Sequence, residues 1–120
     1  MNFNNLPDEM RLLPNWACYR TYTNKEGKRK KVIISPQSGN FAKSNEPNTW
    51  ANFETAKNYC RRYRYSGLTF ALTGGIVFID IDHAIDKTTG EILSPEAKKL
   101  LEMFPDTFCE RSVSGTGIHI

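Results

Sequence analysis

Residues 68–83, LTFALTGGIVFIDIDH, decide the fold. They contain two runs of mostly apolar and β-branched residues, 68–73 and 76–82, separated by Gly74-Gly75. Two-residue turns rich in glycine join antiparallel strands, because glycine readily adopts the positive φ angles that these turns need. We therefore predict a β-hairpin across this stretch.

Upstream of this stretch, the pattern predicts a second hairpin followed by a helix. Bulky and polar residues alternate at 16–23, and an apolar run ends the segment 31–35, with turn-forming residues at 24–27 between them. Apolar residues then recur at helical spacing over 53–63, and Asn52 is placed to cap that helix.

Downstream, Ser94-Pro95 is typical of a helix start, and the apolar residues that follow predict a helix ending before Pro105. Further strands are predicted at 107–113 and from Ile118 onward. This order of elements indicates an α+β fold with a mostly antiparallel sheet and flanking helices. The last strand has no closing partner, and an open edge is costly, so we expect the natural domain to continue beyond the printed sequence.

Composition bounds the class of protein. The 120 residues, 39% of them hydrophobic, suffice for one modest core. No run approaches the roughly 18 consecutive apolar residues of a membrane span, and the N-terminus lacks the pattern of a signal peptide, so we expect a cytoplasmic protein with no membrane partner. Cys18, Cys60 and Cys109 are widely spaced, which favours buried, reduced thiols over disulfides or a zinc site.

Asp80 and Asp82 end the apolar run in an Asp-x-Asp pattern. Side chains two apart on a strand project from one face, about 7 Å apart along the chain. Because two such carboxylates repel each other unless a hard cation lies between them, a metal site is one interpretation. The other is that the strand leaves the core at Asp80 and that both carboxylates are solvated.

Acids at the first, third, seventh and twelfth positions counted from Asp80 also imitate a calcium-binding EF-hand loop. The imitation fails because Ala84 and Ile85 occupy the fifth and sixth positions, where a ligand and a glycine belong. The residues before the loop also predict a strand, whereas an EF-hand has a helix there.

A second motif lies in residues 112–120, SVSGTGIHI. Glycines among small hydroxyl residues let backbone amides approach an anion closely, and a histidine follows the second glycine by two residues. The alternative is that this histidine, flanked by isoleucines, is an ordinary strand residue. The candidate phosphate-binding residues are Ser114, Gly115, Thr116, Gly117 and His119.

Two basic clusters are candidate nucleic-acid contacts, one in the upstream hairpin and one at the end of the helix that follows it. Each also has a structural explanation, since basic residues protect a strand edge from aggregation and favour the C-terminal end of a helix dipole. The net charge of +3 does not decide between these explanations. The clusters consist of Lys28, Arg29, Lys30 and Lys31, and of Arg61, Arg62 and Arg64.

In combination, these motifs resemble the bifunctional DNA primase/polymerase N-terminal domain of phage, plasmid and mobile-element replication proteins, part of the archaeo-eukaryotic primase superfamily. The likeness runs from about Asn15 to the last residue. It depends mainly on residues 80–83, DIDH, and on residues 114–119, SGTGIH.

The resemblance implies a catalytic fold related to the RNA-recognition motif at residues 66–120, preceded by a smaller α/β unit at residues 1–65. It implies that Asp80 and Asp82 are catalytic ligands of Mg²⁺ or Mn²⁺, and that His119 contacts the triphosphate of an incoming nucleotide. The family's third acidic motif, on a downstream strand, has no counterpart here. We therefore expect a catalytic domain truncated at its C-terminal end and inactive by itself.

The implied reaction is primer synthesis or DNA polymerisation by two-metal nucleotidyl transfer. Its partners are a DNA template or primer, nucleoside triphosphates, and a helicase-like ATPase domain elsewhere in the parent protein. The residues alone leave two other functions open: a non-catalytic nucleic-acid or nucleotide-binding module, and a metal-dependent nuclease.

Overall fold

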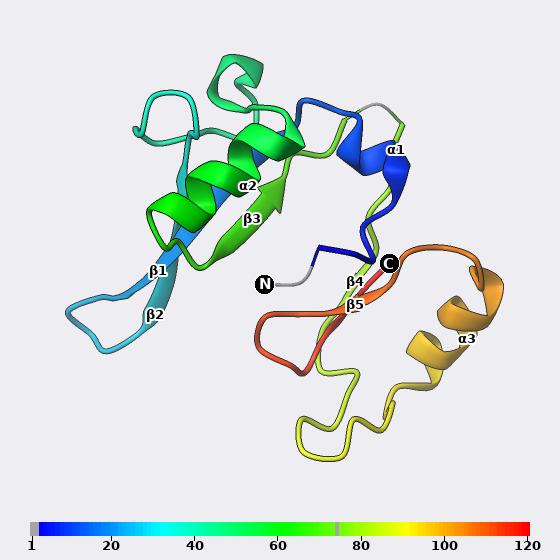
Figure 1. Ribbon diagram of the computed structural model, residues 1–120. Helices are drawn as coiled ribbons and strands as arrows, with labels where there is room; N and C mark the ends of the chain where they lie inside the picture. Colours follow the sequence, from blue (N-terminus) through cyan, green and yellow to red (C-terminus); the bar gives the residue numbers. More distant parts are fainter. Residues whose placement is uncertain (1–2, 74) are drawn as a thin grey trace. The chain divides into compact units, whose positions relative to one another are not determined.

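The computed structural model describes residues 3–73 and 75–120, and it shows an α+β protein with two small antiparallel sheets (Figure 1). The predicted fold class is thereby confirmed. The described residues form two compact units that divide between Gly75 and Ile76. Within the described residues, no helix is long and apolar enough to cross a membrane.

The first unit is built around a three-stranded sheet. Its central strand β1 (Trp16–Thr23) pairs antiparallel with β2 (Arg29–Ile34) on one side and with β3 (Gly67–Phe70) on the other. The hairpin of β1 and β2 is confirmed, and the Asn24 side chain closes its turn by accepting from the backbone N–H of Glu26 and Lys28.

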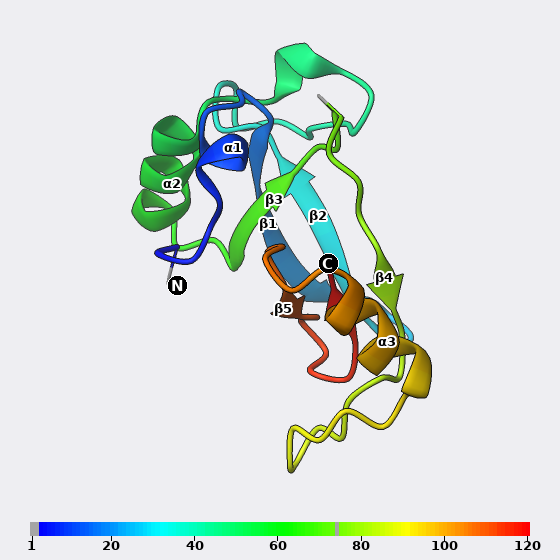
Figure 2. The same ribbon diagram turned by 90° about the vertical axis from the view of Figure 1, so that its right-hand side faces the viewer.

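Helix α2 (Phe53–Arg62) packs along one face of this sheet (Figure 2). The predicted Asn52 cap is present, accepting from the backbone N–H of Thr55 at 2.8 Å. The Trp16 ring meets Phe53 and Phe70 edge-on, with centroids 5.2 and 5.0 Å apart. No sequence pattern predicted two further elements, the short helix α1 (Asp8–Arg11) and the 3₁₀ turn η1 (Pro47–Thr49).

The hairpin predicted at residues 68–82 is wrong. β3 pairs with β1, so that Phe70 lies opposite Trp16, and its proposed partner run contributes only β4 (Asp80–Ile81), which belongs to the second sheet. Half of the predicted turn, Gly74, lies outside the described residues. The glycine pair indicates a turn, but non-local aromatic packing against the core of the first unit determines which strand β3 joins.

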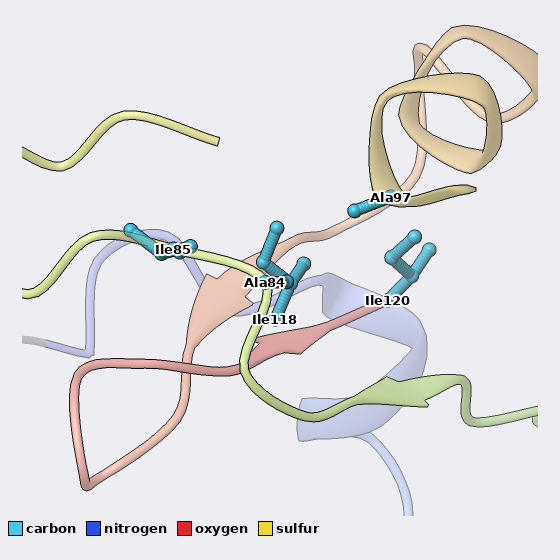
Figure 3. Packing of buried hydrophobic residues seen from close by; sticks show 5 residues of the cluster. All are labelled: Ala84, Ile85, Ala97, Ile118 and Ile120. Atoms are coloured by element: carbon cyan, nitrogen blue, oxygen red, sulfur yellow. The ribbon is translucent and has the colours of Figure 1, made fainter. Parts of the chain in front are cut away.

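The second unit has strand order β4-β6-β5, all antiparallel, with β5 at Glu110–Arg111 and β6 at Ile118–His119. The strand predicted at 107–113 is thus much shorter than expected. Helix α3 (Pro95–Met103) is confirmed, with Ser94 capping it through the Ala97 N–H. Figure 3 shows the core side chains Ala84, Ile85, Ala97, Ile118 and Ile120.

The cysteines divide into two buried residues and one exposed residue. Cys18 and Cys60 are buried in the first unit, and the Cys18 thiol donates to the Ala56 carbonyl at 3.3 Å. Burial raises the pKa of the Cys18 thiol to about 12 and also raises the pKa of Cys60. Cys109 is exposed, so the expectation that it is buried is wrong: it immediately precedes β5, an edge strand.

Native labelling with a thiol reagent at pH 8 should modify Cys109 and spare Cys18 and Cys60, because the thiolate is the nucleophile and burial disfavours it. Peptide mass spectrometry after a timed exposure measures this. Burial and the neighbouring Glu110 charge raise the pKa of Cys109, so its rate should still climb as the pH rises from 7 to 9. Cys109→Ser should remove native labelling, and equal rates at Cys60 and Cys109 would contradict the fold.

Candidate functional site

Asp80, His119 and Glu110 form a row across the second sheet. His119 lies on the central strand β6, opposite Asp80 on β4 and opposite Glu110 on β5. Directly opposed residues of neighbouring strands have side chains on one face, so the three share a face. The Nε2 atom of His119 lies 3.6 Å from Oδ1 of Asp80, and its Nδ1 lies 3.1 Å from Oε1 of Glu110. The topology therefore joins the two sequence motifs.

The imidazole is the least exposed group of the row. The side chain of His119 is 21% exposed, whereas those of Asp80 and Glu110 are 48% and 51% exposed. The Phe78 ring lies 4.9 Å from the imidazole, centroid to centroid. Beyond the row, Ile79 and Ile120 exchange two backbone hydrogen bonds of 2.8 and 2.9 Å, which extend the pairing of β4 with β6. The histidine is thus held from several sides while the carboxylates reach solvent.

Asp82 does not lie on a strand, although the sequence pattern predicts it on the same strand face as Asp80. β4 ends at Ile81, and Asp82 lies in the turn that follows, where the next residue, His83, has a φ of 53°. Ile81 packs against the core, so Asp80 on the opposite side of the strand faces away from it. Strand alternation therefore fixes the direction of Asp80, but the turn fixes that of Asp82.

The glycine-rich turn is closed by its own hydrogen bonds. Ser112 Oγ accepts from the Gly117 N–H at 2.9 Å, and the Ser112 carbonyl accepts from the Gly115 N–H at 2.9 Å. The hydroxyls of Ser112, Ser114 and Thr116 form a chain with spacings of 2.9 and 3.1 Å. Two amides of the turn, those of Gly115 and Gly117, are therefore committed to internal hydrogen bonds.

The turn is also docked onto the segment that follows the acidic motif. The Thr116 carbonyl accepts from the backbone N–H groups of Ala84 and Ile85 at 2.8 and 2.9 Å. A Cβ atom added at Gly117 would lie 3.1 Å from the Ile81 carbonyl oxygen and 3.0 Å from Ser112 Oγ. Both distances are tighter than ordinary side-chain contacts, so glycine at 117 favours this close approach of the two motifs.

Gly117→Ala should destabilise the second unit by about 1–3 kcal/mol, the usual cost of overpacking, because the backbone carbonyl of Ile81 must move. Urea unfolding followed by Ile120 and Ala84 amide signals reports on this unit. Ser114→Ala, at an exposed position of the same turn, is the matched control and should cost far less. Equal unfolding midpoints for Gly117→Ala and the parent would contradict the close approach.

Asp86 caps its own turn. Its Oδ1 accepts from the backbone N–H groups of Thr88 and Thr89 at 2.9 Å each, and these bonds lower its pKa. This use of the carboxylate is consistent with the sequence argument against an EF-hand loop.

The first basic cluster is exposed on the β1–β2 hairpin. Lys31 lies over the Tyr19 ring, with its Nζ 4.9 Å from the centroid, and Arg29 donates to Thr21 Oγ1 at 3.1 Å. Neither contact involves a carboxylate, so the positive charge is not neutralised by these neighbours. Lys28 and Lys30 are exposed as well.

The second basic cluster does not form one patch. Arg61 lines a pocket of about 290 Å³ in the first unit, Arg62 lies over the Tyr63 ring and lines a different pocket, and Arg64 follows the helix with a φ of 54°. Arg61 has basic neighbours, Arg11 and Lys57, that the sequence pattern does not indicate. The residues lining its pocket are Phe3, Asn4, Arg11, Phe53, Glu54, Lys57 and Arg61.

Comparison with known proteins bears on this arrangement. Over 92 residues the chain is 34% identical to the DNA primase-polymerase of Nitratiruptor phage NrS-1. The chain is thus related to the DNA primase-polymerases. The resemblance inferred from the motifs is confirmed over 75% of the chain, which spans only 12% of the phage protein's length. No family model matches the chain.

Metal binding depends on which side-chain donors lie close together. Among residues 3–73 and 75–120, no group of three or more His, Cys, Asp or Glu side chains is placed to hold a metal ion. A closed protein cage is therefore absent from the described chain. Mg²⁺, however, is usually held by one or two carboxylates together with waters and substrate phosphates, and Asp80 and Asp82 suit that mode.

Glu110 is the member of the row that neither sequence motif contains. A signal was available, because a hairpin closed between Ser112 and Gly117 places residue 111 opposite 118 and residue 110 opposite 119. Counting outward from the glycine turn would therefore have paired Glu110 with His119.

Proposed function

We propose that the second unit contributes part of a nucleotidyl-transfer site of DNA replication, making or extending primers. Asp80 and Asp82 bind Mg²⁺ or Mn²⁺ in this proposal, and His119 contacts the triphosphate. The observation that supports it is the placement of Asp80 and His119, distant in sequence, on adjacent strands with 3.6 Å between their side chains. A metal-bound triphosphate needs a cation site and a phosphate donor side by side.

When bound, the divalent ions would activate the attacking 3′-hydroxyl and balance charge on the pyrophosphate leaving group. Asp80 supplies a carboxylate from a paired strand, and Asp82 supplies a second one from the adjoining turn. His119 presents Nε2 on the side of Asp80, where a phosphate oxygen bound near the carboxylates comes within reach. The Ser114 and Thr116 hydroxyls are further donors at the rim.

The first unit supplies candidate DNA contacts. The exposed hairpin cluster carries four basic residues, and the pocket beside Arg61 adds Arg11 and Lys57. Glu54 pairs with Lys57 at 3.0 Å, so the pocket keeps an excess of positive charge. We propose that both regions contact the phosphates of a template or primer. Nucleoside triphosphates and a helicase-like ATPase domain in the parent protein remain proposed partners.

Asp80→Asn should abolish Mn²⁺-dependent triphosphate binding, whereas His119→Ala should keep Mn²⁺ binding and weaken triphosphate binding roughly ten- to a hundredfold. The second range corresponds to about 1.5–3 kcal/mol for a hydrogen bond to a charged group. Calorimetric titration of Mn²⁺ and of a nucleoside triphosphate measures both. Glu102→Gln, an exposed carboxylate on α3, is the control and should change neither.

Two results would count against the proposal. If Asp80→Asn binds Mn²⁺ and triphosphate as the parent does, the acidic motif is not a metal site and a metal-independent binding module is favoured. If folded His119→Ala keeps the parent affinity for triphosphate, the histidine has only a structural role.

Replacing Lys28, Arg29, Lys30 and Lys31 with alanine should weaken single-stranded DNA binding and flatten its salt dependence. Each lost phosphate contact should lower the log–log slope by about 0.7. Fluorescence anisotropy of a labelled oligonucleotide at several salt concentrations gives the slope. Alanine at Lys98 and Lys99, exposed on α3, is the matched control, and an unchanged slope in the hairpin variant would assign that cluster to solubility alone.

A further inference from the structure

We infer that Glu110 is a positioning residue for His119: its carboxylate holds Nδ1–H and thereby directs Nε2 toward Asp80 and the bound phosphate. The inference rests on the proposed function and deepens it, because it assigns the group that decides which nitrogen of the histidine faces the site. The carboxylate and the imidazole come from opposed positions of β5 and β6.

The chemistry of the two partners fixes the hydrogen bond. An ionised carboxylate can only accept, so the Nδ1···Oε1 contact of 3.1 Å requires the proton to lie on Nδ1. This assignment holds whether the ring is neutral or doubly protonated. In either form Nε2 is the nitrogen that faces the site, 3.6 Å from Asp80. Only the doubly protonated ring donates from Nε2 to a phosphate oxygen, because the neutral Nδ1–H ring has a lone pair there.

Ring orientation follows from the same contact. Turning the imidazole over would place a carbon atom next to Glu110 and would lose the hydrogen bond, while Phe78 restricts the ring from its side. Carboxylate groups often orient functional histidines through the second ring nitrogen in this way. The backbone pairing of β5 with β6 holds Glu110 in place for this role.

If Glu110 had a purely structural role, removing its carboxylate would lower the unfolding midpoint. Glu110 is half exposed, and exposed ion pairs contribute little to stability. Removing the carboxylate should therefore barely change the unfolding midpoint, yet it should change the tautomer of His119. The two readouts separate positioning from stabilisation.

Long-range ¹H–¹⁵N spectra of the histidine side chains in the whole chain test the inference, with His83→Asn used to assign the two rings. In the parent, neutral His119 should carry its proton on Nδ1. Glu110→Ala should shift the neutral ring toward the Nε2–H form, which free histidine prefers. Glu110→Gln should retain Nδ1–H because its side-chain oxygen still accepts. His83 is the internal control, and Glu102→Ala is the surface control.

An unchanged Nδ1–H tautomer in Glu110→Ala would overturn the inference. Triphosphate titration in the presence of Mn²⁺ supplies the functional readout. Glu110→Ala should weaken binding at least threefold, because no carboxylate then holds the ring with Nδ1–H on one side and Nε2–H on the phosphate side. Glu110→Gln should restore most of the affinity, and the double variant with His119→Ala should bind no more weakly than His119→Ala alone.

The two proposals fail in distinguishable ways. If His119→Ala leaves triphosphate affinity unchanged, the phosphate role of the histidine fails, and the tautomer spectra still decide whether Glu110 orients the ring. If His119→Ala weakens binding but Glu110→Ala does not, the phosphate role stands and the positioning role of Glu110 is overturned.

Discussion

The register of β6 between its two neighbours is the constraint on which the candidate site depends. Ile118 is 2% exposed and packs in the core, so the next residue, His119, must project from the opposite face. A slip of one residue would bury the histidine and expose the isoleucine. Backbone hydrogen bonds fix the register of β6 against both neighbours. Those between Ile79 and Ile120 lie on the β4 side, and the one between Ser112 and Gly117 lies on the β5 side. Core packing and site geometry are therefore one and the same requirement.

The glycine turn holds the segment after the acidic motif in place beside β6. Its Thr116 carbonyl accepts from two successive amides, and the lack of a side chain at Gly117 lets the turn approach Ile81 closely. These contacts use the backbone of the turn for structure. Two amides of the turn are consequently not available to the anion cradle that the sequence pattern predicts. The observed contacts of the motif hold β5, β6 and the segment after β4 together.

Local signals were sufficient for part of the fold. Asn52 and Ser94 cap the two helices that were predicted, and Asn24 closes the predicted β1–β2 turn, because each of these devices acts within a few residues of sequence. The hairpin at 68–82 failed because the pairing of Phe70 with Trp16 depends on burial in a distant part of the chain. Local pattern does not report such competition between partners.

The residues of the candidate site also differ in whether local sequence indicates them. Asp80, Asp82 and His119 were identified by motif, since their residue types and spacing are local properties. The basic residues around Arg61 were not, because Arg11 reaches that pocket from a short helix without a predictive pattern. Glu110 lies between these cases: its pairing with His119 follows from the turn, but only once β5 and β6 are known to form a hairpin.

The distances on the two sides of His119 show which carboxylate is hydrogen-bonded to the imidazole. At 3.1 Å the Glu110 contact is a hydrogen bond, whereas 3.6 Å to Asp80 is too long for one. Asp80 is therefore not committed to the histidine, and its half-exposed oxygens stay open to a cation. If both carboxylates held the imidazole equally, cation binding would have to break one of those bonds. Of the two carboxylates, only Glu110 is hydrogen-bonded to the ring, so in the proposed site a cation at Asp80 would not compete with the histidine.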